Sequence, residues 1–383
     1  MHVGIDIEQF ATDPYGSGIQ RVLQYLAKEW PGERVQADFV VPRGRGFALL
    51  SPVQAADVLS VPFEPRGDGD LRAAVTSALD RQEAPVVMAG DLLALHDAWL
   101  LPEVSYLPSV LERFALFSRC MPTAAIGYDA LPMTEPANYR FPPGSAAWVS
   151  EYFRLLAVAD SVVCISDYAR DSILGRLRRD PARPICVAHP GGDHIPIRQP
   201  RIDQQSRFDA SPVFVRLGTL EARKRPIEIL RAFRLARARG VDAELVFVGG
   251  ASASDSAIND EIATATREPG IRWVQHATDA EVHALVHAAG AMLSVGVEGY
   301  GIPVLEAIRL GTPVLFAGIQ PAAELMLGGG AFRIDASSPE TLADALEEAA
   351  RPGMLDGMHE GLRPESVPTW ATFAQTVVDH LVD

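Results

Sequence analysis

The segment from residue 291 to residue 313 limits the fold of this chain most strongly. Residues 291–295 are an apolar run long enough for a buried strand, and Gly299 and Gly301 follow within a few residues. Pro303 fits the first position of a helix, where its missing N–H has no cost, and Gly311 provides a stop. The pattern predicts a strand, a glycine turn and a short helix over residues 303–310.

Two carboxylates flank this turn. Glu298 precedes the glycines, and Glu306 lies in the first turn of the expected helix. The N–H groups and the positive dipole end of a helix start favour an anion such as a diphosphate. Carboxylates beside it can accept hydrogen bonds from sugar hydroxyls. The alternative, which the pattern leaves open, is that both are ordinary loop and cap carboxylates.

A second group of residues lies upstream. Residues 213–217 read as a strand, 218–225 as a turn, 226–239 as a helix and 244–248 as another strand, which together make one βαβ unit. Arg223 and Lys224 fall in the strand-to-helix turn, where doubly wound sheets bind ligands. We interpret these two side chains as phosphate-binding cations and the arginines of the following helix as a solvated face.

Two motifs in this order and spacing, residues 218–225 (GTLEARKR) and 298–307 (EGYGIPVLEA), resemble the C-terminal domain of retaining glycosyltransferases of family four. Residues 16–22 resemble the family's glycine loop after the first strand, and the segment headed by Trp370 resembles its terminal helix. The resemblance implies an α/β fold of two Rossmann-like doubly wound domains that face each other across a cleft, known as GT-B. The expected parts are an N-terminal acceptor-binding domain, a linker, a nucleotide-sugar-binding domain and a returning helix, at residues 1–197, 198–210, 211–365 and 366–383.

The resemblance also implies roles for particular residues. Glu298 becomes the carboxylate that faces the donor sugar, Glu306 the ribose-binding carboxylate, and Lys224 the main diphosphate cation, with Arg223 beside it. The other donor-binding positions are Gly16, Gly18, Thr219, Gly249, Val274, Gly299, Tyr300, Gly301 and Ile302.

Two positions depart from the family pattern. Thr219 stands where many relatives have an arginine, so that one phosphate contact is missing or comes from Arg223. Tyr128 and Asp129 stand where many relatives have His-Asp, and both are assigned to the catalytic centre. A phenol there is expected to orient hydroxyl groups rather than to shuttle protons, because its reference pKa is about 10. A half-buried structural tyrosine is the equal alternative.

The reaction implied by the resemblance is transfer of a sugar with retention, from a nucleotide diphosphate sugar of the GDP or UDP type. Mannose is the first expectation, and the acceptor is a glycan, a lipid-linked sugar or a small molecule. Neither a cofactor nor a metal is expected. Two alternatives stay open: a nucleotide-sugar epimerase on the same architecture, and a catalytically silent protein that binds sugar nucleotides or polysaccharide.

Charge and hydropathy restrict the partners and the location. A formal net charge of -15 argues against nonspecific binding to nucleic acid. The apolar runs are too short for a membrane span, and the first residues read as a strand, so a cytoplasmic protein is expected. A basic cluster at residues 176–183 leaves peripheral contact with the inner membrane face open, with a solvated helix end as the simpler interpretation. The sequence does not indicate an oligomeric state.

Histidine and cysteine patterns add little at this stage. His96 lies in a stretch, residues 92–101, with helix-like spacing, and we expect a hydrogen-bonded structural histidine. The three cysteines are scattered in apolar contexts, which predicts buried thiols rather than a metal motif or a disulfide framework.

Overall fold

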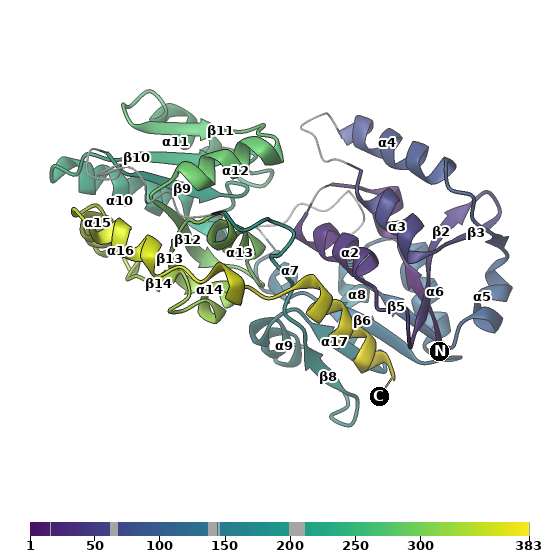
Figure 1. Ribbon diagram of the computed structural model, residues 1–383. Helices are drawn as coiled ribbons and strands as arrows, with labels where there is room; N and C mark the ends of the chain where they lie inside the picture. The colour runs from purple at the N-terminus through teal and green to yellow at the C-terminus, as the bar shows by residue number, and fades with distance from the viewer. Residues whose placement is uncertain (16, 62–67, 137–143, 145, 199–210, 383) are drawn as a thin grey trace. The chain divides into compact units, whose positions relative to one another are not determined.

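The computed structural model describes residues 1–15, 17–61, 68–136, 144, 146–198 and 211–382. It is an α/β protein with two sheets of mostly parallel strands, which confirms the predicted fold class. The chain divides into two compact units (Figure 1). The first comprises Met1–Thr134, Phe141–Pro190 and Thr369–Asp383, and the second Glu135–Arg140 and Gly191–Pro368. Among the described residues, none of the helices has the length and apolar character needed to span a bilayer.

The first unit is built on an eight-stranded sheet. The strand order is β4-β3-β2-β1-β5-β6-β7-β8, with β3 antiparallel to β2 and β4 and all other neighbours parallel. The chain leaves β1 toward β2 and later returns to β5 on the other side, which makes the β1/β5 boundary a topological switch point. The strands are β1 (His2–Asp6), β2 (Gln36–Arg43), β3 (Gly46–Leu50), β4 (Val86–Val87), β5 (Ala98–Leu101), β6 (Thr123–Gly127), β7 (Ser161–Cys164) and β8 (Ile185–Val187).

Helices of the first unit join these strands and cover the sheet. The terminal helix α17 (Trp370–Val382) packs on α2 (Gly18–Lys28) and β7, and its Trp370 ring stacks on Tyr25 with centroids 4.8 Å apart (Figure 1). Helix α9 (Asp167–Leu174) follows Ser166, whose hydroxyl caps it by accepting from the N–H of Ala169. The remaining helices are α1 (Glu8–Thr12), α3 (Pro52–Leu59), α4 (Asp68–Asp80), α5 (Ala89–Leu95), α6 (Pro108–Phe117), α7 (Leu131–Thr134), α8 (Ala146–Val158) and α9 (Asp167–Leu174).

The second unit has a six-stranded parallel sheet in the order β11-β10-β9-β12-β13-β14. This is the order of a doubly wound dinucleotide-binding fold, and its switch point lies between β9 and β12. The strands are β9 (Val213–Leu217), β10 (Glu244–Val248), β11 (Ile271–Val274), β12 (Ala291–Val297), β13 (Val314–Ile319) and β14 (Ala331–Arg333).

Helices lie on both faces of this second sheet. One face forms a core with α10, α11, α15 and α16, and α10 and α15 lie side by side (Figure 1). On the other side α12 contacts β9, and α13 contacts β12 and β13. The helices are α10 (Pro226–Ala238), α11 (Ser256–Ala265), α12 (Asp279–Ala288), α13 (Ile302–Arg309), α14 (Pro321–Leu325), α15 (Pro339–Ala349) and α16 (Met354–Glu360), with 3-10 turns η2 (Ala222–Lys224) and η3 (Pro364–Ser366).

Candidate functional site

The candidate site lies where β9 and β12 end, on the two sides of the switch point of the second unit. Turn η2 follows β9 and packs directly against β12. Gly296, near the end of β12, makes this possible, because a Cβ there would lie 2.0 Å from the carbonyl oxygen of Arg223. Its φ of 110° is also one that glycine adopts without strain. A glycine in β12 therefore allows the two strand ends to approach.

This approach brings the predicted carboxylate and the predicted cations into contact. Glu298 Oε1 lies 2.8 Å from Lys224 Nζ, and Glu298 Oε2 lies 2.8 Å from Arg223 Nη1. Arg223 also donates to the carbonyl of Val297 at 2.6 Å and pairs with Glu221 at 2.6 Å. The side chains of Arg223, Lys224 and Glu298 are 12%, 17% and 23% exposed, so the cluster is largely shielded but open to solvent on one side.

The cluster has a strong effect on the pKa of Glu298. Burial alone would raise that pKa, but the charges of Lys224 and Arg223 and their hydrogen bonds lower it to about 2. The carboxylate is therefore ionised at neutral pH. It holds the two cations in place and competes with any anion that would bind them.

Arg216 is a third cation, which the sequence reading treated only as part of a strand. Its side chain is buried, and burial lowers its pKa to about 10. The guanidinium donates to the carbonyl of Gly218 and, at 2.9 Å, to that of Thr219. Glu221, Glu298 and Arg223 all influence its titration. Three cations and two carboxylates thus give this group of residues a net charge of +1, which favours an anionic ligand.

The neighbouring strand ends are joined by main-chain bonds. Gly218 N–H donates to Val248 O at 2.8 Å, and Gly249 N–H donates to Val274 O at 2.9 Å. Gly249 has φ 142°, and a Cβ there would lie 2.4 Å from the carbonyl oxygen of Gly218. The predicted donor positions Thr219, Gly249 and Val274 therefore lie together at the ends of β9, β10 and β11.

The glycine turn after β12 opens α13 as predicted. Gly301 is the N-cap residue, with φ 106°, and the helix begins at Ile302, one residue before the predicted start. Tyr300 is buried, and its carbonyl accepts from Ala322 N–H at 2.9 Å. Gly299 precedes these residues in the turn, and the first N–H groups of any helix lack an intrahelical acceptor. Within α13, Pro303 has no N–H and Val304 N–H donates to Gly301 O at 3.0 Å, so Ile302 provides the N–H at the helix start.

Glu306 lies one residue further along α13 than predicted, because the helix starts at Ile302, and it falls just beyond the first turn, which contains no acidic residue. The side chain is buried and lies next to His194, with Oε1 and Nε2 2.9 Å apart. A carboxylate can only accept, so the imidazole carries its proton on Nε2. His194 was not predicted. The sequence feature that could have indicated it is Gly192, two residues earlier. A Cβ there would lie 2.6 Å from Leu305 Cβ, so the glycine lets this segment lie against α13.

The other predicted positions belong to the first unit. Gly16 lies outside the described residues. Gly18 is the first residue of α2, whose N-cap Ser17 accepts from Gln20 N–H at 3.2 Å. Helix α1 lies between β1 and this loop, so the loop does not directly follow the strand as expected.

Tyr128 is buried, and its hydroxyl donates to Pro102 O at 2.7 Å. This matches the structural alternative, although the tyrosine is fully rather than half buried. Burial and the nearby Glu103 raise its pKa well above the ordinary value. Asp129 accepts from the N–H of Leu131 at 2.9 Å and caps the start of α7. Their part in catalysis stays a prediction.

Glu103 is a further buried carboxyl, which the sequence reading missed. It follows β5 and accepts from Phe10 N–H at 3.0 Å, at the β1/β5 switch point of the first unit. Burial raises its pKa to about 8, although the bonds from Phe10 and Gln20 oppose the change. The sequence feature that could have indicated it is a carboxylate two residues after an apolar strand.

The basic cluster at residues 176–183 is in part structural. Arg179 donates to the carbonyls of Leu156, Ala159, Asp160 and Pro184. Arg183 donates to Val158 O and pairs with Asp160 at 3.2 Å. These two arginines therefore make structural contacts within the first unit, whereas Arg176 and Arg178 of the same cluster are exposed.

Comparison with known proteins identifies the second unit. Residues 198–353 match the model of the glycosyl transferases group 1 family. The match covers less than half of the chain and includes both motifs, residues 218–225 and 298–307. This match agrees with the family resemblance predicted from the two motifs.

Individual relatives extend the likeness over the whole chain. The chain is 24% identical over 374 residues to the serotype-specific mannosyltransferase WbdA of Escherichia coli, covering 90% of this chain and 42% of that protein. It therefore spans less than half the length of this relative. The crystal structure of Anabaena HepE in complex with UDP and glucose superposes with a TM-score of 0.66 at 14% identity, covering 100% of this chain and 99% of that one. WaaG, a glycosyltransferase involved in lipopolysaccharide biosynthesis, gives 0.55 at 16% identity, covering 98% and 95%. At these identities the structural likeness confirms the predicted GT-B type of fold.

Proposed function

We propose that this chain is a retaining glycosyltransferase that moves a sugar from a nucleotide diphosphate sugar to an acceptor hydroxyl. The observation that carries the proposal is the contact of Glu298 with Lys224 and Arg223 at the switch point of a dinucleotide-binding type of sheet. Ligands of doubly wound sheets bind at this point, outside the carboxyl ends of the strands.

The cation cluster suits the diphosphate. Lys224 and Arg223 can neutralise its charge, and the N–H groups of Gly301 and Ile302 at the start of α13 can donate to its oxygens. As the bond from the anomeric carbon to the diphosphate breaks, charge develops on the leaving oxygen. Stabilisation of this charge is worth about 3 kcal/mol for each well-placed donor.

Glu298 acts on the donor sugar in this proposal. When the diphosphate takes over the cations, the Glu298 carboxylate is released to accept from a sugar hydroxyl and to stabilise positive charge on the ring. The acceptor oxygen attacks the anomeric carbon from the face that the diphosphate leaves, and the acceptor proton passes to a phosphate oxygen. The configuration at the anomeric carbon is retained.

Glu306 and His194 serve the nucleoside. With His194 donating to Oε1, the second oxygen of Glu306 can accept from ribose hydroxyls. A first choice of donor is GDP-mannose, supported by the likeness to a mannosyltransferase, and UDP-glucose is the second, supported by the fold of a protein that was crystallised with UDP and glucose. Acceptors of the glycan, lipid-linked and small-molecule classes all fit.

The test is a donor-hydrolysis screen across sugar nucleotides, with release of the nucleoside diphosphate as the readout. The proposal expects one nucleotide sugar to be cleaved, and Glu298→Gln to lower turnover much more than donor affinity. Glu268→Gln, in a surface pair with Arg234, is the matched control and should leave both unchanged. Release of an isomerised sugar nucleotide instead of the diphosphate would point to an epimerase. Binding without any turnover would point to a silent binding protein.

A further inference from the structure

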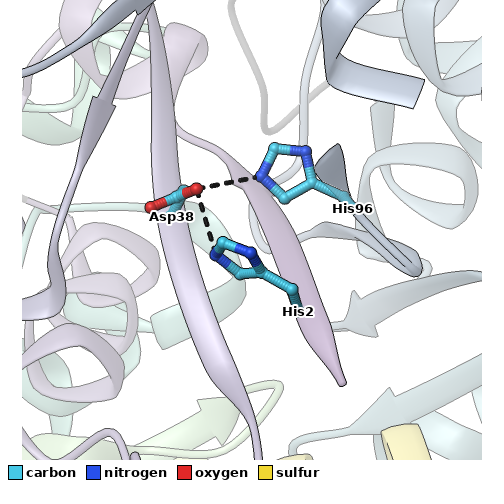
Figure 2. Close-up of side chains that lie close together, drawn as sticks. All are labelled: His2, Asp38 and His96. Atoms are coloured by element: carbon cyan, nitrogen blue, oxygen red, sulfur yellow. Dashed lines mark hydrogen bonds and ion pairs between the residues drawn. The ribbon is translucent and has the colours of Figure 1, made fainter. Parts of the chain in front are cut away.

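Three side chains at the edge of the first unit form a cluster that the proposed transfer reaction does not use. They are His2 on β1, Asp38 on β2 and His96 between α5 and β5 (Figure 2). Both Nε2 atoms face the same oxygen of Asp38: His2 Nε2 lies 3.1 Å and His96 Nε2 3.2 Å from Oδ2. One ligand atom from each residue lies within 4.8 Å of the other two.

The strand register brings these residues together. β1 pairs with β2 so that Gly4 lies opposite Asp38, and β1 pairs with β5 so that Gly4 lies opposite Trp99. Side chains two residues apart on a strand point to the same face, so His2 and Asp38 are diagonal neighbours. A Cβ at Gly4 would lie 2.3 Å from the ring of Trp99 and 3.3 Å from His96 Cγ. The glycine therefore provides the space that the Trp99 ring occupies, with His96 packed beside it.

His96 does not lie within a helix, contrary to the sequence expectation, because α5 ends at Leu95 and β5 starts at Ala98. Its side chain is fully buried. Nδ1 lies 2.9 Å from the carbonyl oxygen of Leu92, so Nδ1 must carry a proton. With Nδ1 used in this bond, Nε2 is the ring atom that faces the Asp38 carboxylate, and an unprotonated Nε2 there can serve as a metal ligand.

A hydrogen bond from histidine Nδ1–H to a backbone carbonyl is one of the arrangements that orient metal-binding imidazoles. Two imidazoles and a carboxylate are also ligands that suit zinc. In a tetrahedral zinc site with bonds of about 2.0–2.1 Å, neighbouring ligand atoms are ~3.3 Å apart. The two distances from Nε2 to Asp38 Oδ2 are close to this spacing.

We propose that His2, Asp38 and His96 bind one divalent transition-metal ion, with Zn²⁺ as the best match. The ligands are Nε2 of His2, Nε2 of His96 and a carboxylate oxygen of Asp38, and water completes the coordination. The ion joins the starts of β1 and β2, two inner strands of the sheet, to the α5–β5 connection. Its role is structural, because the cluster lies at the N-terminal end of β1, whereas ligands of such sheets bind at the switch point, outside the carboxyl ends of the strands.

The experiment is a titration of the full chain, freed of any affinity tag and stripped of metal, with Zn²⁺ alone against a chromophoric chelator. The wild-type protein should bind one ion per chain. His2→Ala and Asp38→Asn should each weaken binding by at least roughly ten- to hundredfold. These two residues are chosen because their side chains are 34% and 18% exposed, so their replacement disturbs the core less than replacement of His96.

Two control variants keep the test specific. His276→Ala removes an exposed histidine of the second unit, and Cys120→Ser removes an exposed thiol; both should bind Zn²⁺ like the wild type. Zn²⁺ should also raise the Tm of the wild type but not that of Asp38→Asn. If the three residues form only a hydrogen-bonded triad, the variants should change in Tm and the wild type should not bind Zn²⁺. That result, or equal affinity in His2→Ala and His276→Ala, would overturn the proposal.

Discussion

Replacement of Glu298 with glutamine should destabilise the ends of β9 and β12. The folded-state pKa of about 2 lies well below the ordinary value of 4.5. At about 1.4 kcal/mol per pKa unit, the ionised carboxylate contributes roughly 3 kcal/mol at neutral pH. This is an upper value, because the side chain is 23% exposed and solvent screens part of the interaction. The contribution is complete above the unfolded pKa and is lost as the pH falls toward the folded pKa.

Peptide-resolved hydrogen exchange is the suitable assay, because the chain has two units and global unfolding need not be two-state. A loss of roughly 3 kcal/mol corresponds to exchange more than a hundredfold faster in the peptides that contain η2 and the end of β12. The difference between wild type and Glu298→Gln should shrink below about pH 4.5, where the unfolded carboxyl takes up a proton.

Glu268→Gln serves as the control for this measurement as well. Glu268 pairs with Arg234 on the surface of the same unit, with side chains 42% and 37% exposed, and such pairs contribute about 0–1 kcal/mol. Equal exchange in Glu298→Gln and Glu268→Gln would refute the view that Glu298 holds a shielded ion cluster.

Two further predictions concern stability. Burial raises the pKa of Glu103 to about 8, so the contribution of its carboxyl group to stability is complete below pH ~4.5 and is lost as the pH rises through about 8. The Tm measured between these limits should therefore fall with pH in the wild type, and fall less in Glu103→Gln. Parallel curves for the two proteins would count against the raised pKa. Gly249→Ala should cost about 1–3 kcal/mol in chemical denaturation because of its φ of 142° and the carbonyl oxygen of Gly218, whereas Gly250→Ala, with open space around it, should be near neutral. An equally mild effect in both variants would show that the turn is not strained.

Local signals in the sequence were enough to predict the elements around the site. The apolar run, the glycines and Pro303 define a strand, a turn and a helix within a few residues of each other, and the structure places α13 within one residue of the expected limits. The same holds for α10, where Pro226 opens the helix and Gly240 follows its end. Such signals depend on backbone geometry that a few residue types impose.

Contacts between distant segments were harder to predict. Contact of Glu298 with Lys224 depends on Gly296, whose missing side chain admits the carbonyl of Arg223. Pairing of Glu306 with His194 depends on a segment more than 100 residues away in sequence. In the sequence, Arg216 is a polar residue within a strand. Its place in the cation cluster follows from the hydrogen bonds that it donates to the carbonyls of Gly218 and Thr219. None of these pairings leaves a periodic pattern.

Buried polar residues were the main source of errors. His96 was expected in a helix because apolar residues around it recur at helical spacing, but they belong to the end of α5 and to the buried strand β5. Short apolar runs of this kind do not separate helix from strand. Arg179, which is partly buried, was grouped with the basic cluster because the sequence alone does not show the four carbonyl acceptors that converge on it.

Calorimetric titration of nucleotides into the wild type and Lys224→Met tests the central claim most directly. If Lys224 and Arg223 bind a diphosphate, the preferred nucleoside diphosphate should bind the wild type more tightly than the matching monophosphate. Lys224→Met should lose most of this preference while keeping its affinity for the monophosphate. The same preference for the diphosphate in both proteins, or no binding of any nucleotide to the wild type, would contradict the account.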